Sequence, residues 1–171
     1  SWAMACFDRQ SFALCGRTVL SLRRNLVTPL TACLGELGFR CADHLSRGYI
    51  EISRGRRSNR FYLSGGRDEG SAALIQGATL AGVLFDEVAL MPRSFVEQAL
   101  ARCSVEGARF WFSCNPEHPA HWFYTEWICR AEARNALYLH FAMRDNPSLS
   151  PAVLARYESL YSGSFYERFV L

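Results

Sequence analysis

Two adjacent carboxylates follow a short apolar run in the middle of the chain. The run is Gly-Val-Leu-Phe at residues 82–85, and Asp86 and Glu87 come directly after it. Two neighbouring carboxylates repel one another unless a divalent cation supplies the compensating charge. An Asp that positions magnesium against a nucleotide, followed by a Glu that polarises the attacking water, is the Walker B arrangement. The pattern favours a magnesium–nucleotide site, and an ordinary acidic pair at the start of a helix is the alternative.

A second polar group follows another apolar run, further along the chain. Residues 110–112 are Phe-Trp-Phe, and Ser113-Cys114-Asn115-Pro116 come next. If the two runs are neighbouring parallel strands, Ser113 and Asn115 lie beside the acidic pair at one edge of the sheet. The Asn side chain both donates and accepts hydrogen bonds, so it suits a sensor of a γ-phosphate. An Asn-Pro turn without a ligand is the alternative for Asn115 taken alone.

Short apolar runs supply the strands that would present these groups. Strands are predicted at residues 11–15, 48–53, 59–64, 81–85, 109–113 and 137–141. In a parallel sheet, ligands bind at the carboxyl ends of the strands. The residues that follow each strand therefore carry the functional information.

Apolar residues at helical spacing separate several of these strands. A helix is predicted over residues 18–37, where Pro29 should kink or split it and Gly38 should cap its C-terminus. Further helices are predicted from Pro92, from Pro119 and from Pro151, the last with Leu154, Tyr157 and Tyr161 inward and closed by Gly163. Buried strands alternating with helices predict an α/β fold, a mostly parallel sheet with helices on both faces.

Composition limits the chemistry that the chain can perform. All 19 basic residues are Arg, and the chain contains no Lys. This excludes Schiff-base chemistry, a Lys general base and the P-loop pattern, whose Lys must reach the β- and γ-phosphates. The length of 171 residues is enough for one domain with a real core and short for two.

The formal net charge of +3 is unevenly distributed. Residues 1–67 carry 11 Arg and four acidic residues, whereas residues 68–171 carry eight Arg and 12 acidic residues. A basic turn between two predicted strands contains Arg54, Arg56, Arg57 and Arg60. Arg suits phosphate contacts that do not read bases, so these residues are candidates for DNA binding. A solvated hairpin tip is the alternative.

Seven Cys residues without a C-x-x-C motif indicate reduced, buried thiols in a reducing cytosol. Four residues also raise a different possibility, a small zinc-binding nucleic-acid module. These are Cys114, His118, His121 and Cys129. Their spacing matches no common zinc finger, and metal analysis of the purified protein would decide between the two hypotheses.

The order and spacing of the motifs resemble the ATPase domain of the phage terminase large subunit. The resemblance covers residues 10–171 and rests on Gly65-Gly66-Arg67-Asp68-Glu69, Gln76-Gly77, Phe85-Asp86-Glu87, Phe112-Ser113-Cys114-Asn115-Pro116-Glu117, His121-Trp122, Asp145-Asn146-Pro147 and Leu149. This family packages viral DNA into empty capsids. The resemblance implies an incomplete P-loop NTPase-like fold, with residues 1–171 forming a single partial ATPase domain.

The resemblance also implies roles for individual residues. Asp86 would hold Mg²⁺–ATP, and Glu87 would be the catalytic carboxylate. Ser113 and Asn115 would lie in the coupling motif, which links hydrolysis to DNA movement. ATP and Mg²⁺ are therefore the expected cofactors. Arg17 falls where related motors contact nucleotide or DNA, with a salt bridge or a carbonyl cap as the alternative.

Partners and location follow from the same resemblance. Double-stranded DNA would be translocated, the portal protein and the small terminase subunit would be protein partners, and full-length subunits would form a homo-oligomeric ring. The expected location is the cytoplasm of the bacterial host. No apolar run approaches the roughly 18 residues that cross a bilayer, so no membrane partner is expected.

The sequence departs from the family pattern in three ways. The Walker A loop would lie before Ser1, and the nuclease domain would begin after Leu171. The trans-acting Arg is unassigned, with Arg67 the nearest candidate. Because ATP turnover needs charge neutralisation around the phosphoryl group, the isolated chain is expected to have negligible ATPase activity. A helicase-like ATPase fragment and an inactive prophage remnant are the remaining alternatives.

Overall fold

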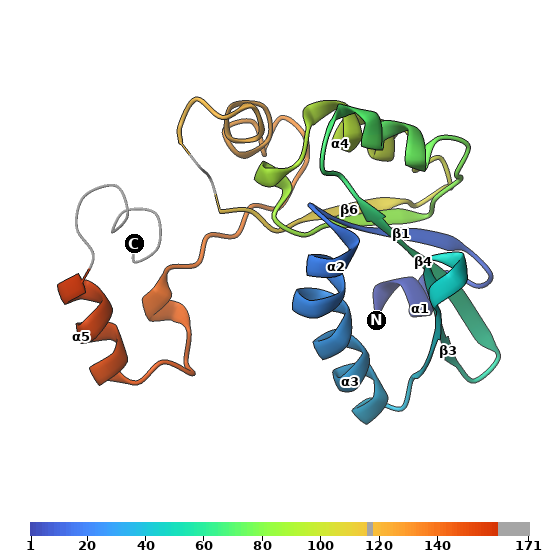
Figure 1. Ribbon diagram of the computed structural model, residues 1–171, viewed down its shortest axis with the longest axis horizontal. Coiled ribbons are helices and arrows are strands. Elements are labelled where there is room, and N and C mark those ends of the chain that lie inside the picture. The colour runs from blue at the N-terminus through green and yellow to red at the C-terminus, as the bar shows by residue number, and fades with distance from the viewer. Residues whose placement is uncertain (116–117, 161–171) are drawn as a thin grey trace. The chain divides into compact units, whose positions relative to one another are not determined.

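The computed structural model describes residues 1–115 and 118–160. The chain forms two compact units, Ser1–Cys114 and Asn115–Leu171, which are described separately. The first unit is built on one sheet with helices packed against it (Figure 1). In the described part of the chain, no helix is long and apolar enough to span a membrane.

The sheet of the first unit has six strands in the order β2-β3-β4-β1-β5-β6. Strands β4, β1, β5 and β6 run parallel, whereas β2, β3 and β4 pair in antiparallel fashion. The bounds are β1 (Ser11–Gly16), β2 (Arg40–His44), β3 (Tyr49–Arg54), β4 (Arg57–Gly65), β5 (Gly82–Phe85) and β6 (Arg109–Phe112). The predicted α/β fold is confirmed. The sheet is mixed because β2 and β3 extend its parallel part with antiparallel pairs.

A two-residue turn produces the antiparallel part of the sheet. Arg54 of β3 pairs with Arg57 of β4, so Gly55 and Arg56 form the turn between them. Gly55 has a φ of 61°, and glycine at the first central position suits the tight turns that match the twist of a hairpin. The two strands predicted around the basic turn are therefore confirmed as β3 and β4.

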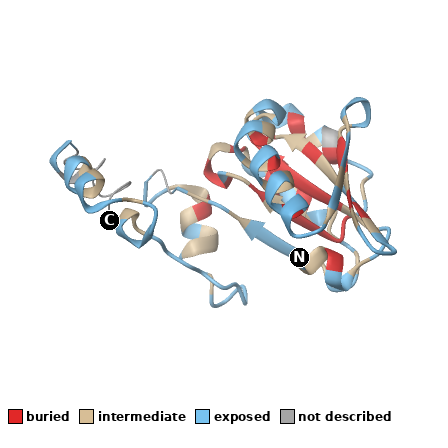
Figure 2. Ribbon diagram, turned by 90° about the horizontal axis from the view of Figure 1, so that it is seen from below, coloured by how far each residue is buried: buried red, intermediate tan, exposed pale blue. Residues whose placement is uncertain are grey.

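Helices cover both faces of the sheet, as predicted. The helices α1 (Trp2–Cys6), α2 (Val19–Leu22) and α3 (Thr28–Glu36) lie on one face, and α4 (Arg93–Ala101) lies on the other (Figure 1). One buried cluster joins the first three helices to the strands and consists of Met4, Leu14, Leu22, Val27, Leu34, Ile50, Ile52 and Leu63. Figure 2 shows the buried residues concentrated in the strands of this unit.

The effect of Pro29 on its helix is a local widening. A π-helical turn, Arg23–Val27, joins α2 to α3, so the helical path continues through Pro29. The Thr28 hydroxyl donates to the carbonyl of Arg23 at 3.0 Å. Proline has no N–H to donate to the preceding turn, and a π-helical turn is a known way to absorb such an irregularity. Gly38, with a φ of 79°, ends the helix as expected.

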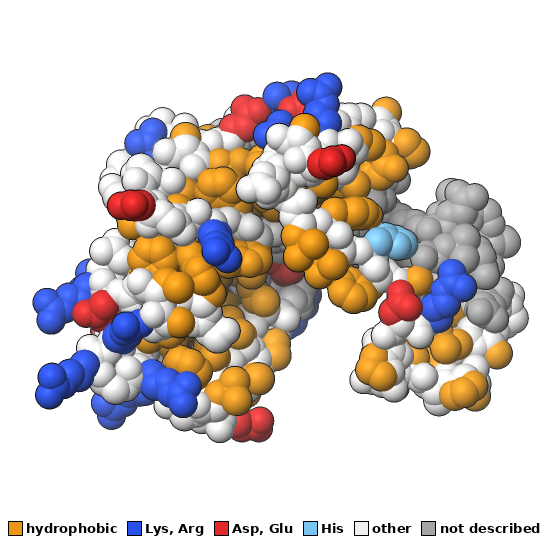
Figure 3. All heavy atoms as spheres, turned by 180° about the vertical axis from the view of Figure 1, so that it is seen from behind, with side chains coloured by type: hydrophobic (Ala, Val, Ile, Leu, Met, Phe, Trp, Pro, Cys, Tyr) orange, Lys and Arg blue, Asp and Glu red, His pale blue; other side chains and the backbone are white. Residues whose placement is uncertain are grey.

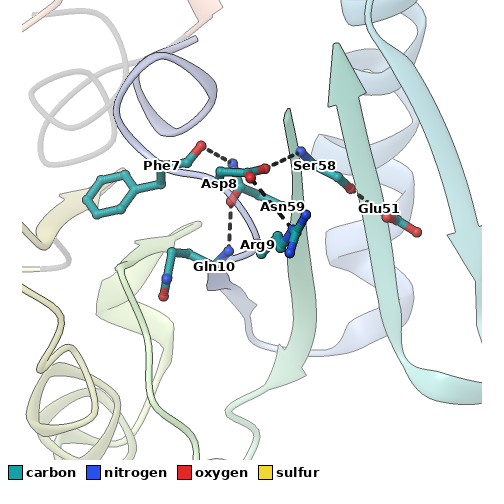
Figure 4. A network of polar contacts seen from close by, with 7 residues as sticks. All are labelled: Phe7, Asp8, Arg9, Gln10, Glu51, Ser58 and Asn59. Carbon is teal, nitrogen blue, oxygen red and sulfur yellow. Dashed lines mark hydrogen bonds and ion pairs between the residues drawn. The ribbon is translucent and has the colours of Figure 1, made fainter. Parts of the chain in front are cut away.

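A buried amide anchors the N-terminal segment to β4. Asn59 is fully buried, and its Nδ2 donates to the carbonyls of Ala3 (3.2 Å) and Phe7 (3.1 Å). Its Oδ1 accepts a hydrogen bond from the Gln10 N–H at 2.9 Å (Figure 4). Next to it, the Asp8 carboxylate accepts from the Ser58 N–H, also at 2.9 Å. Asn59 thus satisfies main-chain groups that would otherwise be buried without partners.

Aromatic contacts join the first helix to the last strand of the sheet. The rings of Trp2 in α1 and Trp111 in β6 lie edge to face, with centroids 4.8 Å apart. The Arg109 guanidinium lies 5.7 Å from the Trp2 ring centroid. This arrangement contributes aromatic and cation–π attraction in addition to apolar burial.

The second unit contains short helical segments. These are a π-helical turn at Tyr124–Ile128, a 3-10 turn at Met143–Asp145 and helix α5 (Pro151–Leu160). The strand predicted at 137–141 is wrong, since Leu137 and Phe141 are 85% and 74% exposed and belong to no strand. An alternating pattern fits a strand, but a strand also requires a neighbour to hydrogen-bond with, and no described segment supplies one. Tyr161 and Gly163, predicted to end α5, lie outside the described residues.

Candidate functional site

The carboxyl ends of the parallel strands meet at one edge of the sheet. Just beyond β4, the Gly66 N–H donates to the Gly16 carbonyl at the end of β1, at 2.8 Å. The Asp86 N–H, just beyond β5, donates to the Cys15 carbonyl at 2.8 Å, and the Ser113 N–H, just beyond β6, donates to the Phe85 carbonyl at 2.9 Å. These hydrogen bonds hold together the segments that follow the strands. They form the edge at which ligands of such sheets bind.

Close packing explains the glycines at this edge. A Cβ atom on Gly66 would lie 2.5 Å from the Phe95 ring of α4. A Cβ atom on Gly65 would lie 3.2 Å from the Val19 nitrogen at the start of α2. The helices therefore approach the end of β4 from both faces because those two positions have no side chain.

The acidic pair emerges at this edge in an unusual backbone conformation. Asp86 is half-buried, and Glu87 is exposed with φ and ψ of 56° and 57°. Left-handed backbone is disfavoured for a residue with a Cβ, and such residues persist only where the surroundings hold them. Val88, which follows Glu87, is fully buried and begins a 3-10 turn, Val88–Leu90. Glu87 is thus held between a strand and a buried turn.

Ser113 contacts both acidic residues. Its hydroxyl donates to Asp86 Oδ1 at 3.0 Å and accepts from the Glu87 N–H at 2.9 Å. Its carbonyl accepts from the Val88 N–H at 2.9 Å. The structure therefore brings together three of the four residues that the sequence placed at the nucleotide site.

Asn115, the fourth of these residues, is exposed and is the first residue of the second unit. Its role as a γ-phosphate sensor stays a prediction. Pro116 and Glu117, which complete the predicted motif, lie outside the described residues.

Two exposed Arg residues share the sheet edge with the acidic pair. Arg17 follows Gly16 at the end of β1, and Arg67 follows Gly66 just beyond β4. The hydrogen bond between Gly66 and Gly16 keeps these two positions close along the edge. Their proposed contacts with nucleotide, DNA or a neighbouring subunit stay predictions.

The basic turn divides into structural and exposed Arg residues. Arg57 donates to the carbonyls of Met4 and Ala5 and so caps the end of α1. The guanidinium of Arg54 lies 4.9 Å from the Phe39 ring centroid, and that of Arg60 lies 5.5 Å from the Tyr49 centroid. Arg56 is exposed in the turn itself. Figure 3 shows Arg side chains gathered over the part of this unit that carries the hairpin.

The zinc alternative gains no support from the geometry. Among the described residues, which include all four proposed ligands, no group of three or more His, Cys, Asp or Glu side chains could hold a metal ion. His118 and His121 each use Nδ1 to accept a main-chain N–H, from Ala120 (3.1 Å) and Phe123 (3.2 Å). Both imidazoles thus take part in local turns.

The thiols are free, but most of them are not buried. Only Cys15 is fully buried, and Cys6, Cys33 and Cys129 are exposed, so the prediction of mostly buried thiols is wrong. Burial raises the pKa of Cys15 strongly and that of Cys103 to about 11. Both thiols therefore stay protonated near neutral pH, which makes them poor nucleophiles and poor metal ligands.

The contact that the sequence missed is the double role of the Ser113 hydroxyl. The pattern Ser-Cys-Asn-Pro suggested a polar loop beside the acidic pair, and the spacing of two strands indicated proximity. No local signal reports a left-handed Glu, because that conformation depends on partners distant in sequence. The pairing of one hydroxyl with two neighbouring residues thus becomes visible only in three dimensions.

Comparison with known proteins assigns the family. The family model described as phage terminase large subunit matches residues 8–168. The structure of the large terminase from a thermophilic bacteriophage is 52% identical, with a TM-score of 0.94, and covers 99% of this chain and 42% of that chain. The same terminase in complex with ADP is 50% identical, with a TM-score of 0.94 and the same coverage. No curated protein sequence matches the chain.

A more distant structure shares the fold. The ATPase domain of the large terminase of Thermus phage P74-26 is 17% identical, with a TM-score of 0.54, and covers 72% of this chain and 54% of that chain. The present chain spans less than half the length of the thermophilic bacteriophage terminase. The motifs, the fold and the family model agree, and the chain belongs to the phage terminase large subunit family.

Proposed function

We propose that this chain forms part of the ATP-hydrolysing unit of a phage DNA-packaging motor. Structures of the thermophilic bacteriophage terminase in complex with ADP and with ATP-gamma-S support nucleotide binding in this family. The observation that carries the proposal is the pair Asp86 and Glu87 at the carboxyl end of β5, both held by Ser113. An acidic pair at this edge of a parallel sheet suits a magnesium–nucleotide complex.

The donor chemistry of the pair fits magnesium. Mg²⁺ prefers oxygen ligands and is commonly bound through one or two carboxylates together with phosphates of the substrate. Asp86 would hold the ion, which would neutralise the charge that develops on the phosphates. Glu87, exposed at the same edge, would orient the attacking water and accept its proton. Asn115 would sense the γ-phosphate.

The isolated chain has no lysine with which to grip the phosphates. In P-loop enzymes, that lysine reaches the β- and γ-phosphates and contributes to neutralising the transferred group. We therefore expect negligible ATP turnover by this chain alone. Turnover would require a phosphate-binding loop from outside these 171 residues.

The remaining partners follow from the same function. Double-stranded DNA is the expected substrate of translocation, and the exposed Arg56 of the hairpin is a candidate phosphate contact. The portal protein, the small terminase subunit and other copies of the large subunit in a ring are the expected protein partners. The cytoplasm of the bacterial host is the expected location.

A chimera tests the proposed function. This chain replaces the matching segment of the thermophilic bacteriophage terminase, a graft that their shared fold and sequence support. The variant Glu87→Gln should lower ATP turnover by at least about 100-fold, the range for loss of a general base. The matched control is Glu106→Gln, because Glu106 is an exposed acid of the same unit and stands outside the site.

The controls separate the possible results. A drop with Glu87→Gln and normal turnover with Glu106→Gln would support the assignment. Normal turnover with Glu87→Gln would overturn it. ATPase activity of the isolated chain that Glu87→Gln abolishes would overturn the expectation that this chain needs an external phosphate-binding loop.

A further inference from the structure

We propose that Ser113 is a positioning residue, whose single hydroxyl sets the geometry of both carboxylates without contacting the nucleotide. The inference rests on the proposed function, because it concerns the residues assigned to the same reaction. It differs from a role in nucleotide contact or in coupling alone. It assigns the hydroxyl to the arrangement of Asp86 and Glu87 before any ligand arrives.

The first step of the argument is the chemistry of the hydroxyl. Ser113 Oγ donates its one hydrogen to Asp86 Oδ1 (3.0 Å) and accepts the Glu87 N–H (2.9 Å). A hydroxyl is a small group that can donate and accept at once. Alanine at this position can do neither, whereas threonine retains both functions. Ser113 is exposed, which leaves room for the additional methyl group.

The second step concerns the main chain around Glu87. The Asp86 N–H donates to the Cys15 carbonyl and the Val88 N–H donates to the Ser113 carbonyl, so both flanking amides are held by main-chain acceptors. The Glu87 N–H is held by a side chain. Glu87 also has the left-handed conformation, with a φ of 56°. The conformation that aims its carboxylate therefore depends on one replaceable hydroxyl.

The third step concerns the Asp86 carboxylate. Its Oδ1 is occupied by the Ser113 hydroxyl, which fixes the rotation of the carboxylate. Among the described residues, no hydrogen bond engages its Oδ2, which is therefore the oxygen available to a cation. Groups that orient a metal ligand from behind commonly change metal affinity or activity about 10- to 100-fold when they are removed.

Hydrogen exchange on the chain itself tests the geometry without any ATPase assay. In Ser113→Ala, the Glu87 amide should exchange about tenfold faster, the effect of losing one hydrogen bond of ordinary strength. The amides of Asp86 and Val88 serve as internal controls, because their acceptors are main-chain carbonyls. Ser113→Thr should restore protection of Glu87. Ser104→Ala, at an exposed serine of the same unit, should leave all three amides unchanged.

Turnover by the terminase chimera tests the consequence for chemistry. Ser113→Ala should lower kcat about 10- to 100-fold with little change in the KM for ATP, and Ser113→Thr should recover most of it. The titration of Mg²⁺ should shift to higher concentrations in the Ala variant alone.

The two experiments distinguish failure of this inference from failure of the proposed function. Normal turnover with Glu87→Gln would remove the function itself. Loss of turnover with Glu87→Gln, together with normal turnover in Ser113→Ala, would overturn only the inference. Unchanged exchange at Glu87 in Ser113→Ala, or equal loss of activity in the Thr and Ala variants, would also overturn it.

Discussion

Gly66 and Gly35 differ in the space that surrounds their Cα atoms. A Cβ on Gly66 would lie 2.5 Å from the Phe95 ring, which is fully buried under α4. We expect Gly66→Ala to lower the free energy of unfolding by about 1–3 kcal/mol, because a packed ring must shift to admit the methyl group. Urea denaturation measures the change.

Gly35 supplies the matched control. It lies in α3 with a negative φ, and a methyl group on its Cα would meet nothing within 4 Å. Gly35→Ala should therefore stabilise the unit by about 0.5–1 kcal/mol, the usual gain in helix propensity. If both variants change stability in the same direction, the crowding assigned to Gly66 is wrong.

Glu51 gives the first unit a pH-dependent contribution to stability. Its carboxylate accepts from the Ser58 hydroxyl at 2.5 Å and lies 3.5 Å from His44 Nε2, and these contacts lower its pKa below the ordinary 4.5. Because the folded state holds the lower pKa, the stabilisation is present above about pH 4.5 and is lost as the pH falls through the folded value. Glu51→Gln should therefore reduce the midpoint of urea unfolding at pH 7 and not at pH 3. A constant difference across this range would contradict the assignment.

At the level of elements, a polar side chain holds α1 and the segment after it. Asn59 makes three hydrogen bonds to main-chain groups of the N-terminal segment while fully buried. Asn59→Ala should lower the free energy of unfolding by about 2–4 kcal/mol, because it leaves buried main-chain groups without partners. Chemical denaturation checks the magnitude, and Asn25→Ala, at an exposed position of the π-helical turn, is the control. A loss below about 0.5 kcal/mol would show that water replaces the amide.

The elements that the sequence predicted well are those with local signals. The apolar run before Asp86, the hairpin at Gly55 and the helix disturbed at Pro29 all follow from residues close in sequence. The segment 137–141 was wrong because alternation describes a side-chain pattern and says nothing about a partner strand. The proximity of Ser113 to the acidic pair could be predicted from strand order. The left-handed Glu87 could not, since tertiary hydrogen bonds decide it.

At the level of the whole molecule, the excess of Arg in residues 1–67 predicts a surface that attracts polyanions. Arg56, exposed at the hairpin turn, is the residue most available for this purpose, because Arg57 caps α1 and Arg54 and Arg60 lie over aromatic rings. Arg56→Ala should weaken binding to double-stranded DNA uniformly across sequences. It should also reduce the slope of log affinity against log salt by about one.

Arg93→Ala is the control for this measurement, because Arg93 pairs with Glu97 on α4 at 2.6 Å. Fluorescence anisotropy of labelled duplexes at several salt concentrations gives both slopes. Equal slopes for the Arg56 variant and the unmodified chain would remove the hairpin from the DNA-binding surface.

The contact between Trp2 and Trp111 offers an optical readout of folding. The two indoles come from nearly opposite ends of the first unit's sequence and meet at a centroid distance of 4.8 Å. Ring pairs this close couple their electronic transitions, so the near-ultraviolet circular dichroism of the chain carries a signal that exists only while α1 is seated against β6. Replacing Trp2 with phenylalanine would isolate that signal, and its decay would time the release of the N-terminal helix.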